Sequence, residues 1–175
     1  CGNPWAVLVL MRRLFTWRQI PKMLELKNML IGYVKKSTEL SDTEKGDILG
    51  ECDLIMSFLC YNDILAMSAL HRSASRQMSG PAMSIRTYGS WTFGSPSVLM
   101  MFHREPGKLP EELAAMNESM PYYYRITDGH GQGAELLMQA EAAFMQGDIL
   151  KAHIELEKAR QRVKEKGQIN MDLCC

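Results

Sequence analysis

The chain has 175 residues, which is enough for one domain with a well-buried core and does not require two. Twenty Lys and Arg residues balance twenty Asp and Glu residues, so the positive excess that accompanies binding to nucleic acid or anionic membranes is missing. The longest apolar run, Trp5 to Met11, is far shorter than the roughly 20 residues that cross a bilayer. We therefore expect a single domain over residues 1–175 that has neither nucleic acid nor a membrane as a partner.

The cysteines indicate the compartment. They are five in number and lack the spacing of a disulfide framework, which favours a reducing cytoplasm. Arg12 and Arg13 follow the first apolar run instead of preceding it, and there is no initiator Met, so a signal peptide is a poor interpretation. We expect a cytoplasmic fragment of a larger protein.

Apolar residues recur at intervals of three and four along the chain, which predicts helices. In chain order the stripes are Met23, Leu26, Leu30 and Tyr33; Ile48, Cys52, Ile55 and Leu59; Met67, Leu70 and Ala74; Leu137, Ala140 and Phe144; and Ile149, Ala152, Leu156, Ala159 and Val163. Each stripe needs a neighbouring element to cover it.

Helix boundaries can be predicted from capping residues and helix breakers. Ser41 and Glu44 form a capping box, so a helix should begin near Asp42. The pair at 95–96, Ser then Pro, and Pro110 with two Glu residues after it predict two more starts. Breaks are expected at "NPW", "SGP", "REPGKLP" and "TDGHGQG", which would divide the chain into helical hairpins.

One hairpin near the C-terminus resembles a tetratricopeptide repeat. Its small and apolar positions, and the turn between them, are Ala140, Ala143, Gly147, Asp148, Ala152, Leu156 and Ala159. Fainter turns lie near Thr16, Asn62 and Gly107, about 40 to 46 residues apart, which is near the range of helical solenoids. The fold prediction is all-α, a superhelix of antiparallel helix pairs (a TPR-like α-solenoid) with about four pairs.

Three stretches, "LVLMRRLFTWRQIPKMLELK", "GSWTFGSPSVLMMFHREPGKLPEEL" and "MPYYYRITDGHGQGAELLMQAEAAFMQGD", resemble the helical-repeat region of MalT-like, LuxR-family transcriptional regulators. The resemblance implies the superhelix that senses an inducer or a regulatory protein, in a regulator that uses ATP and self-associates at full length. The chain has no G-x-x-x-x-G-K-[ST] loop and no basic recognition helix at its C-terminal end, so we expect no cofactor and no DNA contact in this fragment.

The stretch from Pro121 to Glu135 holds the most unusual local sequence. "GHGQG" lacks the G-x-G-x-x-G spacing and no strand precedes it, so a flexible connection is expected instead of a phosphate-binding loop. Tyr122, Tyr123 and Tyr124 cannot all face one core, because side chains on a helix are about 100° apart. At least one of these rings should be exposed or line a groove.

Five residues are candidates for a ligand-binding concave face: Trp91, His103, Tyr122, Tyr123 and Arg125. Aromatic rings and an arginine suit a sugar, a small aromatic molecule or a peptide. Each of them can instead pack between repeats, and His103 can be a semi-buried, hydrogen-bonded residue of its predicted helix.

The functional prediction is a sensor or protein-interaction superhelix, and the alternative is a passive adaptor that holds partner proteins or peptides without a small-molecule ligand. The four histidines are scattered and no Cys pair has metal-binding spacing, so neither a metal site nor an enzyme is expected.

Overall fold

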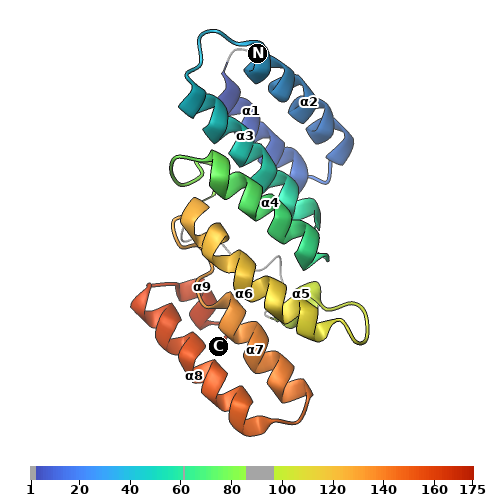
Figure 1. Cartoon of the computed structure of the whole chain (residues 1–175), viewed down its shortest axis with the longest axis vertical. Coiled ribbons are helices and arrows are strands. Elements are labelled where there is room, and N and C mark those ends of the chain that lie inside the picture. The colour runs from blue at the N-terminus through green and yellow to red at the C-terminus, as the bar shows by residue number, and fades with distance from the viewer. Residues whose placement is uncertain (1–2, 61, 86–96) are drawn as a thin grey trace.

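In the computed structural model, the described part of the chain, residues 3–60, 62–85 and 97–175, is all-α and contains no β-strand (Figure 1). The helices are α1 (Pro4–Thr16), α2 (Ile20–Lys36), α3 (Asp42–Ser57), α4 (Ile64–Gln77), α5 (Leu99–Phe102), α6 (Leu109–Ile126), α7 (Ala134–Met145), α8 (Ile149–Glu165) and α9 (Ile169–Asp172), with a 3-10 turn at Phe58–Cys60.

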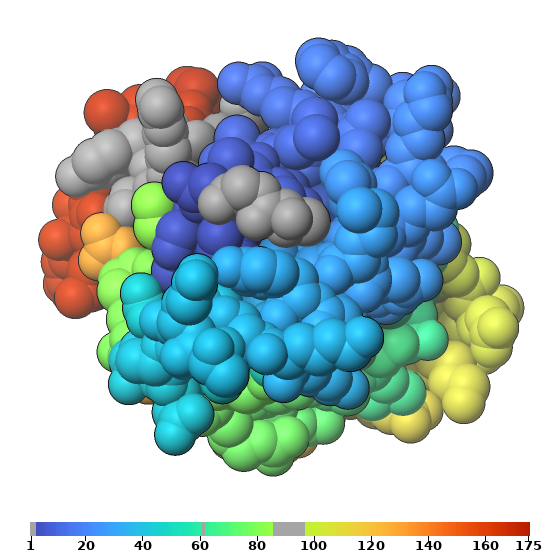
Figure 2. Space-filling view, turned by 90° about the horizontal axis from the view of Figure 1, so that it is seen from above, coloured from blue at the N-terminus to red at the C-terminus, as the bar shows by residue number. Residues whose placement is uncertain are grey.

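The helices follow one another along the long axis of the molecule (Figure 1). α1 packs against α2 and α3, α3 against α4, α4 against α6, α6 against α7, and α7 against α8. Short connections make α1 with α2, α3 with α4, and α7 with α8 antiparallel hairpins. Seen from the N-terminal end, α2 and the segment after it cover the near face, while the start of α6 and the C-terminal helices emerge on opposite sides (Figure 2).

Capping residues set several helix ends. The predicted capping box is confirmed: the backbone N–H of Ser41 donates to Glu44 Oε2 at 2.8 Å, and the N–H of Glu44 donates to Ser41 Oγ at 3.2 Å. The break predicted at "NPW" is wrong, because the Asn3 side chain accepts from the backbone of Trp5 at 2.9 Å and begins α1. Asparagine is a strong N-cap because its side-chain oxygen satisfies a helix N–H that has no partner within the helix.

The predicted turns are confirmed as connections between helices. α1 ends at Thr16, the Asp63 carboxylate caps α4, and the Asp148 carboxylate caps α8 by accepting from Lys151 N at 3.0 Å. Gly107 and Gly147 have φ values of 85° and 81°, a conformation that glycine adopts without steric cost. The sequence therefore predicts where the chain reverses.

The segment before α6 differs from the prediction. The start expected at residues 95–96 lies outside the described residues, and α5 has only four residues, ending at Phe102. His103 follows the helix in extended backbone (φ −75°, ψ 117°), so the placement of His103 on a helix was wrong. The start near Pro110 is confirmed, since α6 begins at Leu109.

The buried apolar residues of the described segments form two clusters. The first joins α1, α2 and the inner face of α3, with Met11, Leu30 and Ile55 fully buried. The second extends from Leu54 of α3 to α9. α3 therefore contributes to both clusters.

Close packing of α3 on α4 depends on glycine. A Cβ on Gly46 would lie 2.6 Å from the carbonyl oxygen of Gln77, and a Cβ on Gly50 would lie 2.4 Å from the Met78 side chain. These distances are shorter than van der Waals contact, so the two helices approach as closely as they do because these positions lack a side chain.

No helix in the described segments combines the length and the apolar character that a membrane span requires.

Candidate functional site

An apolar groove lies between α5 and the hairpin of α7 and α8, and we call it the α5–α8 groove. Its volume is about 650 Å³, within the range of small-molecule sites. The residues that line it are Ser97, Leu99, Met100, His103, Leu137, Ala140, Glu141, Phe144, Met145, Ile149, Ala152, His153, Leu156, Cys174 and Cys175. Segments far apart in the sequence therefore meet around one concave surface.

The groove has a buried floor and an exposed apolar rim. Leu137, Ala140 and Ala152 on the floor are buried. The rim residues Met100, Phe144, Met145 and Ile149 are between 60 and 74% exposed. Large apolar side chains gathered at one exposed site commonly mark a contact surface, and flexible thioethers adapt to different ligands. The groove is suited to cover an apolar ligand.

Glu141 holds one wall of the groove in place. Its carboxylate accepts from the backbone N–H of Leu99 at 2.7 Å, at the beginning of α5. Burial raises the pKa of Glu141, and hydrogen bonds from the α5 backbone and from Ser97 oppose that rise. Glu141 therefore anchors α5 to α7, because it satisfies a helix N–H that would otherwise need water.

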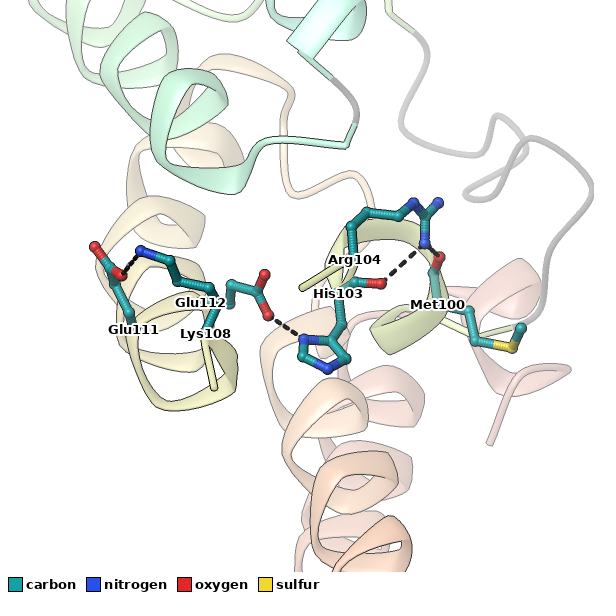
Figure 3. Close-up of polar contacts among 6 residues, drawn as sticks. All are labelled: Met100, His103, Arg104, Lys108, Glu111 and Glu112. Carbon is teal, nitrogen blue, oxygen red and sulfur yellow. Dashed lines mark hydrogen bonds and ion pairs between the residues drawn. The ribbon is translucent and has the colours of Figure 1, made fainter. Parts of the chain in front are cut away.

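His103 lies at the edge of the groove, and its Nδ1 lies 2.6 Å from Glu112 Oε2 in α6 (Figure 3). Next to it, Arg104 donates to the carbonyl of Met100 and to Asn62 Oδ1, the latter at 2.9 Å. These contacts fix the chain between α5 and α6. His103 is thus the one candidate from the sequence that the structure places among the groove residues.

Tyr122 and Tyr123 point to different surroundings. Tyr122 is 37% exposed, which confirms that at least one tyrosine lies at the surface, but it does not line the groove. Tyr123 is 4% exposed; its ring centroid lies 4.9 Å from that of His71, and its hydroxyl lies 2.8 Å from His130 Nδ1. Burial raises the pKa of Tyr123. Tyr123 therefore lies in the core and does not line the groove.

Arg125 joins two helices instead of facing a ligand. Its guanidinium donates to the carbonyl and hydroxyl oxygens of Ser75, the latter at 2.9 Å, and to the carbonyl of Met78 at 3.0 Å. These acceptors lie at the end of α4, so Arg125 satisfies carbonyls that have no partner within that helix. Trp91 lies outside the described residues. The structure therefore does not bring the candidate residues together.

The glycine-rich loop from Asp128 to Gly133 is held by side chains. Gly131 N donates to Gln168 Oε1 at 3.1 Å, and Gly133 N donates to the Tyr124 hydroxyl at 3.1 Å. His130 is buried against Tyr123. These contacts correct the expectation of a flexible connection, and they occupy backbone N–H groups that a phosphate would need.

A buried polar cluster joins α3, α4 and α6. His71 Nε2 lies 3.0 Å from Ser57 Oγ, and His71 Nδ1 lies 3.1 Å from Ser119 Oγ. The Ser57 hydroxyl donates to the carbonyl of Leu54 at 2.7 Å, so it accepts from Nε2, and a neutral ring then accepts at Nδ1 from the Ser119 hydroxyl. Burial lowers the pKa of His71 to about 3. Ser57 and Ser119 are fully buried, so this serine–histidine arrangement has no access for a substrate.

The described residues contain no group of three His, Cys, Asp or Glu side chains placed to hold a metal ion. No protein-family model, curated protein or solved structure matches this chain.

Sequence reasoning missed most of the groove because it assigned Phe144 and Ile149 to buried stripes. Both have the helical spacing of core residues, yet both are exposed at the rim. A signal was present in the sequence: Phe144, Met145, Ile149 and Leu150 flank a three-residue connection, and apolar residues on both sides of a turn exceed what the hairpin can bury.

Proposed function

We propose that the protein is a sensing module, a TPR-like α-solenoid that binds a small apolar molecule in the α5–α8 groove. The observation that carries this proposal is the apolar rim of Met100, Phe144, Met145 and Ile149 around a groove of about 650 Å³. A small molecule of that size would remove several exposed side chains from water at once, which is the main source of affinity for apolar ligands.

The antiparallel hairpins and their neighbour-to-neighbour packing support the solenoid. α1 with α2, α3 with α4, and α7 with α8 are successive pairs, and they are joined in turn by packing of α1 and α2 on α3, of α4 on α6 and of α6 on α7. Such packing is what repeat proteins show, because each repeat buries its apolar face on the next. The short α5 contacts α7, and the groove lies between α5 and the hairpin of α7 and α8.

The setting that the sequence resemblance implies is the cytoplasmic superhelix of a MalT-like, LuxR-family regulator, with ATP-binding and DNA-binding regions elsewhere in the full-length protein. Binding in the groove would contact α5, α7 and α8 together. A ligand shifts such a domain between states only if its contacts differ between them, and a groove shared by three helices allows that difference.

The test uses N-phenyl-1-naphthylamine, a neutral apolar fluorophore, titrated into the protein. We expect saturable binding at one site. Ile149→Asp places a charge on the rim and should weaken binding about tenfold or more, equivalent to about 1.4 kcal/mol. Leu150→Asp is the matched control, since Leu150 is the next residue, is 73% exposed and does not line the groove. Equal effects of the two variants, or no saturable binding, would refute the proposal.

A passive adaptor is the second candidate, and one observation favours it: Leu150, Ile169 and Leu173 are exposed as well, although they do not line the groove. An adaptor would use this surface for another protein chain. A synthetic amphipathic helical peptide that binds wild type and Ile149→Asp but loses binding to Leu150→Asp would favour the adaptor over the sensor.

A further inference from the structure

Two consecutive cysteines, Cys174 and Cys175, form part of the wall of the α5–α8 groove. Both are partly buried and carry free thiols. They pack against the apolar cluster that includes Leu137 and Leu156, and Cys174 Sγ donates to the carbonyl of Asn170 at 3.4 Å. The groove thus combines an apolar cavity with two thiol side chains in its wall.

The thiols are poorly suited to reactions that require a thiolate. Burial raises the pKa of Cys174 and raises the pKa of Cys175 to about 11. Few of these side chains are then ionised near neutral pH, so exchange with disulfides and attack on alkylating agents are slow. A condensation in which two neutral thiols lose their protons to departing water consumes no thiolate overall, so the high pKa of the thiols does not oppose it.

The number of side chains that can bind a metal or metalloid restricts the ligand further. Glu141, His103 and His153 also line the groove, but no three His, Cys, Asp or Glu side chains among the described residues are placed to hold a metal ion together. A metal ion that needs three or four protein ligands is therefore not accommodated. A trivalent organoarsenic centre needs two, because a carbon substituent already occupies its third bond. Trivalent arsenic is also soft, as thiol sulfur is.

We propose that the α5–α8 groove binds a trivalent organoarsenical, with arsenic bonded to Cys174 and Cys175 and the organic group against the apolar lining. This deepens the proposed function and rests on it. In the reaction R–As(OH)₂ plus two thiols gives R–As(S–Cys)₂ plus two water molecules. Two As–S bonds replace two As–O bonds, the thiol protons leave in the water, and no oxidation state changes.

The apolar lining makes the organic group part of the recognition. Phe144 and Ile149 at the rim and Leu156 in the wall would cover an aryl group next to the sulfur atoms. Arsenite has no such group and can gain only the bonds to sulfur. The groove should therefore bind an arylarsenical more tightly than arsenite, and the difference in affinity should be larger than two thiols without an apolar groove would produce.

Phenylarsine oxide and arsenite are the probes, with binding measured by calorimetry and adducts by intact mass. We expect one phenylarsenic group per chain and the loss of two titratable thiols. Cys174→Ser and Cys175→Ser should each weaken phenylarsine oxide binding about 100-fold, because the second sulfur bond forms within the same molecule. Cys60→Ala removes a partly buried thiol outside this groove and is the control that should bind as wild type does.

Ile149→Asp separates the role of the groove from that of the thiols. It should lower the affinity for phenylarsine oxide about tenfold and leave arsenite binding unchanged, since only the aryl group meets the rim. Loss of phenylarsine oxide binding in Cys60→Ala, or equal weakening of both arsenicals by Ile149→Asp, would overturn the proposal. If the neutral fluorophore still binds the Cys174→Ser/Cys175→Ser protein while wild type takes up no arsenical, this inference fails and the sensing function stands.

Discussion

The Tyr123 hydroxyl and Nδ1 of His130 share a buried hydrogen bond of 2.8 Å that joins α6 to the glycine-rich loop seven residues later. The aromatic residues and the glycines of "PYYYRITDGHGQGAE" therefore belong to one packed unit. Tyr123 enters the core from α6, and the loop folds back so that His130 meets it. The loop orients α7, which supplies the floor of the α5–α8 groove.

Removing that hydroxyl should reduce stability. Tyr123→Phe keeps the ring and loses the bond to His130, so we expect the free energy of unfolding in urea to fall by about 1 kcal/mol. Tyr122→Phe is the matched control on the next residue, because its side chain is partly exposed, and it should change stability by less than about 0.5 kcal/mol. Equal losses in both variants would mean that the buried bond contributes nothing.

Protonation of His71 should destabilise the fold in acid. Its pKa is about 3 in the folded chain and about 6.5 when unfolded, so the unfolded state binds more protons between these values. Stability from the neutral ring is complete above about pH 6.5 and is lost as pH falls toward 3. Between pH 7 and pH 5 the loss should be about 2 kcal/mol, measured by urea unfolding at each pH.

His71→Gln provides the control for this pH dependence. Burial raises the pKa of Glu51 and Glu141, so these carboxyls favour folding as pH falls and oppose the effect of His71. Glutamine can occupy the space between the Ser57 and Ser119 hydroxyls but does not titrate. A slope of stability against pH that is the same in His71→Gln as in wild type would contradict the assignment to His71.

Replacing glycine by alanine should have opposite effects on stability in α3 and in α2. Gly46→Ala would bring a Cβ within 2.6 Å of the Gln77 carbonyl oxygen, so we expect a loss of about 1 to 3 kcal/mol despite the higher helix propensity of alanine. Gly32→Ala in α2 meets nothing within 4 Å and should gain about 0.5 to 1 kcal/mol. Thermal unfolding of both variants tests the sign, and a stabilising Gly46→Ala would contradict the close contact of α3 with α4.

Arg125 should contribute more than an exposed ion pair of the same helix. Arg125→Lys retains the charge but loses the planar fork that reaches Ser75 and Met78, so we expect a loss of about 1 to 3 kcal/mol. Glu118→Gln removes the exposed pair with Arg72 at 2.6 Å and should cost less than about 0.5 kcal/mol. Chemical denaturation measures both, and a reversed order would refute the structural role of Arg125.

Local sequence predicted much of the secondary structure because its signals act over a few residues. The Ser41 and Glu44 capping box and the turns at Gly107 and Gly147 depend on neighbouring backbone groups, and each lies where expected. Asn3 was misassigned because a break and a cap use the same residue types. Whether a helix ends or begins at such a residue depends on the chain that follows it and not on the residue type.

The candidate site was less predictable because it depends on segments distant in sequence. Arg125 looked available for a ligand, yet its acceptors belong to α4, about 50 residues earlier. Phe144 has core spacing, but it is 65% exposed at the rim of the groove beside the four-residue α5. Such outcomes depend on tertiary packing, which composition and periodicity do not determine.

The buried apolar residues form two clusters, and α3 contributes Leu54 to one and Ile55 to the other. This division affects how the molecule unfolds locally. We expect amide hydrogens of α1 and α2 and those of α7 and α8 to belong to different cooperative units, which would exchange with deuterium at different rates and respond separately to denaturant. Occupancy of the groove would then slow exchange in the C-terminal unit and leave the N-terminal unit unaffected.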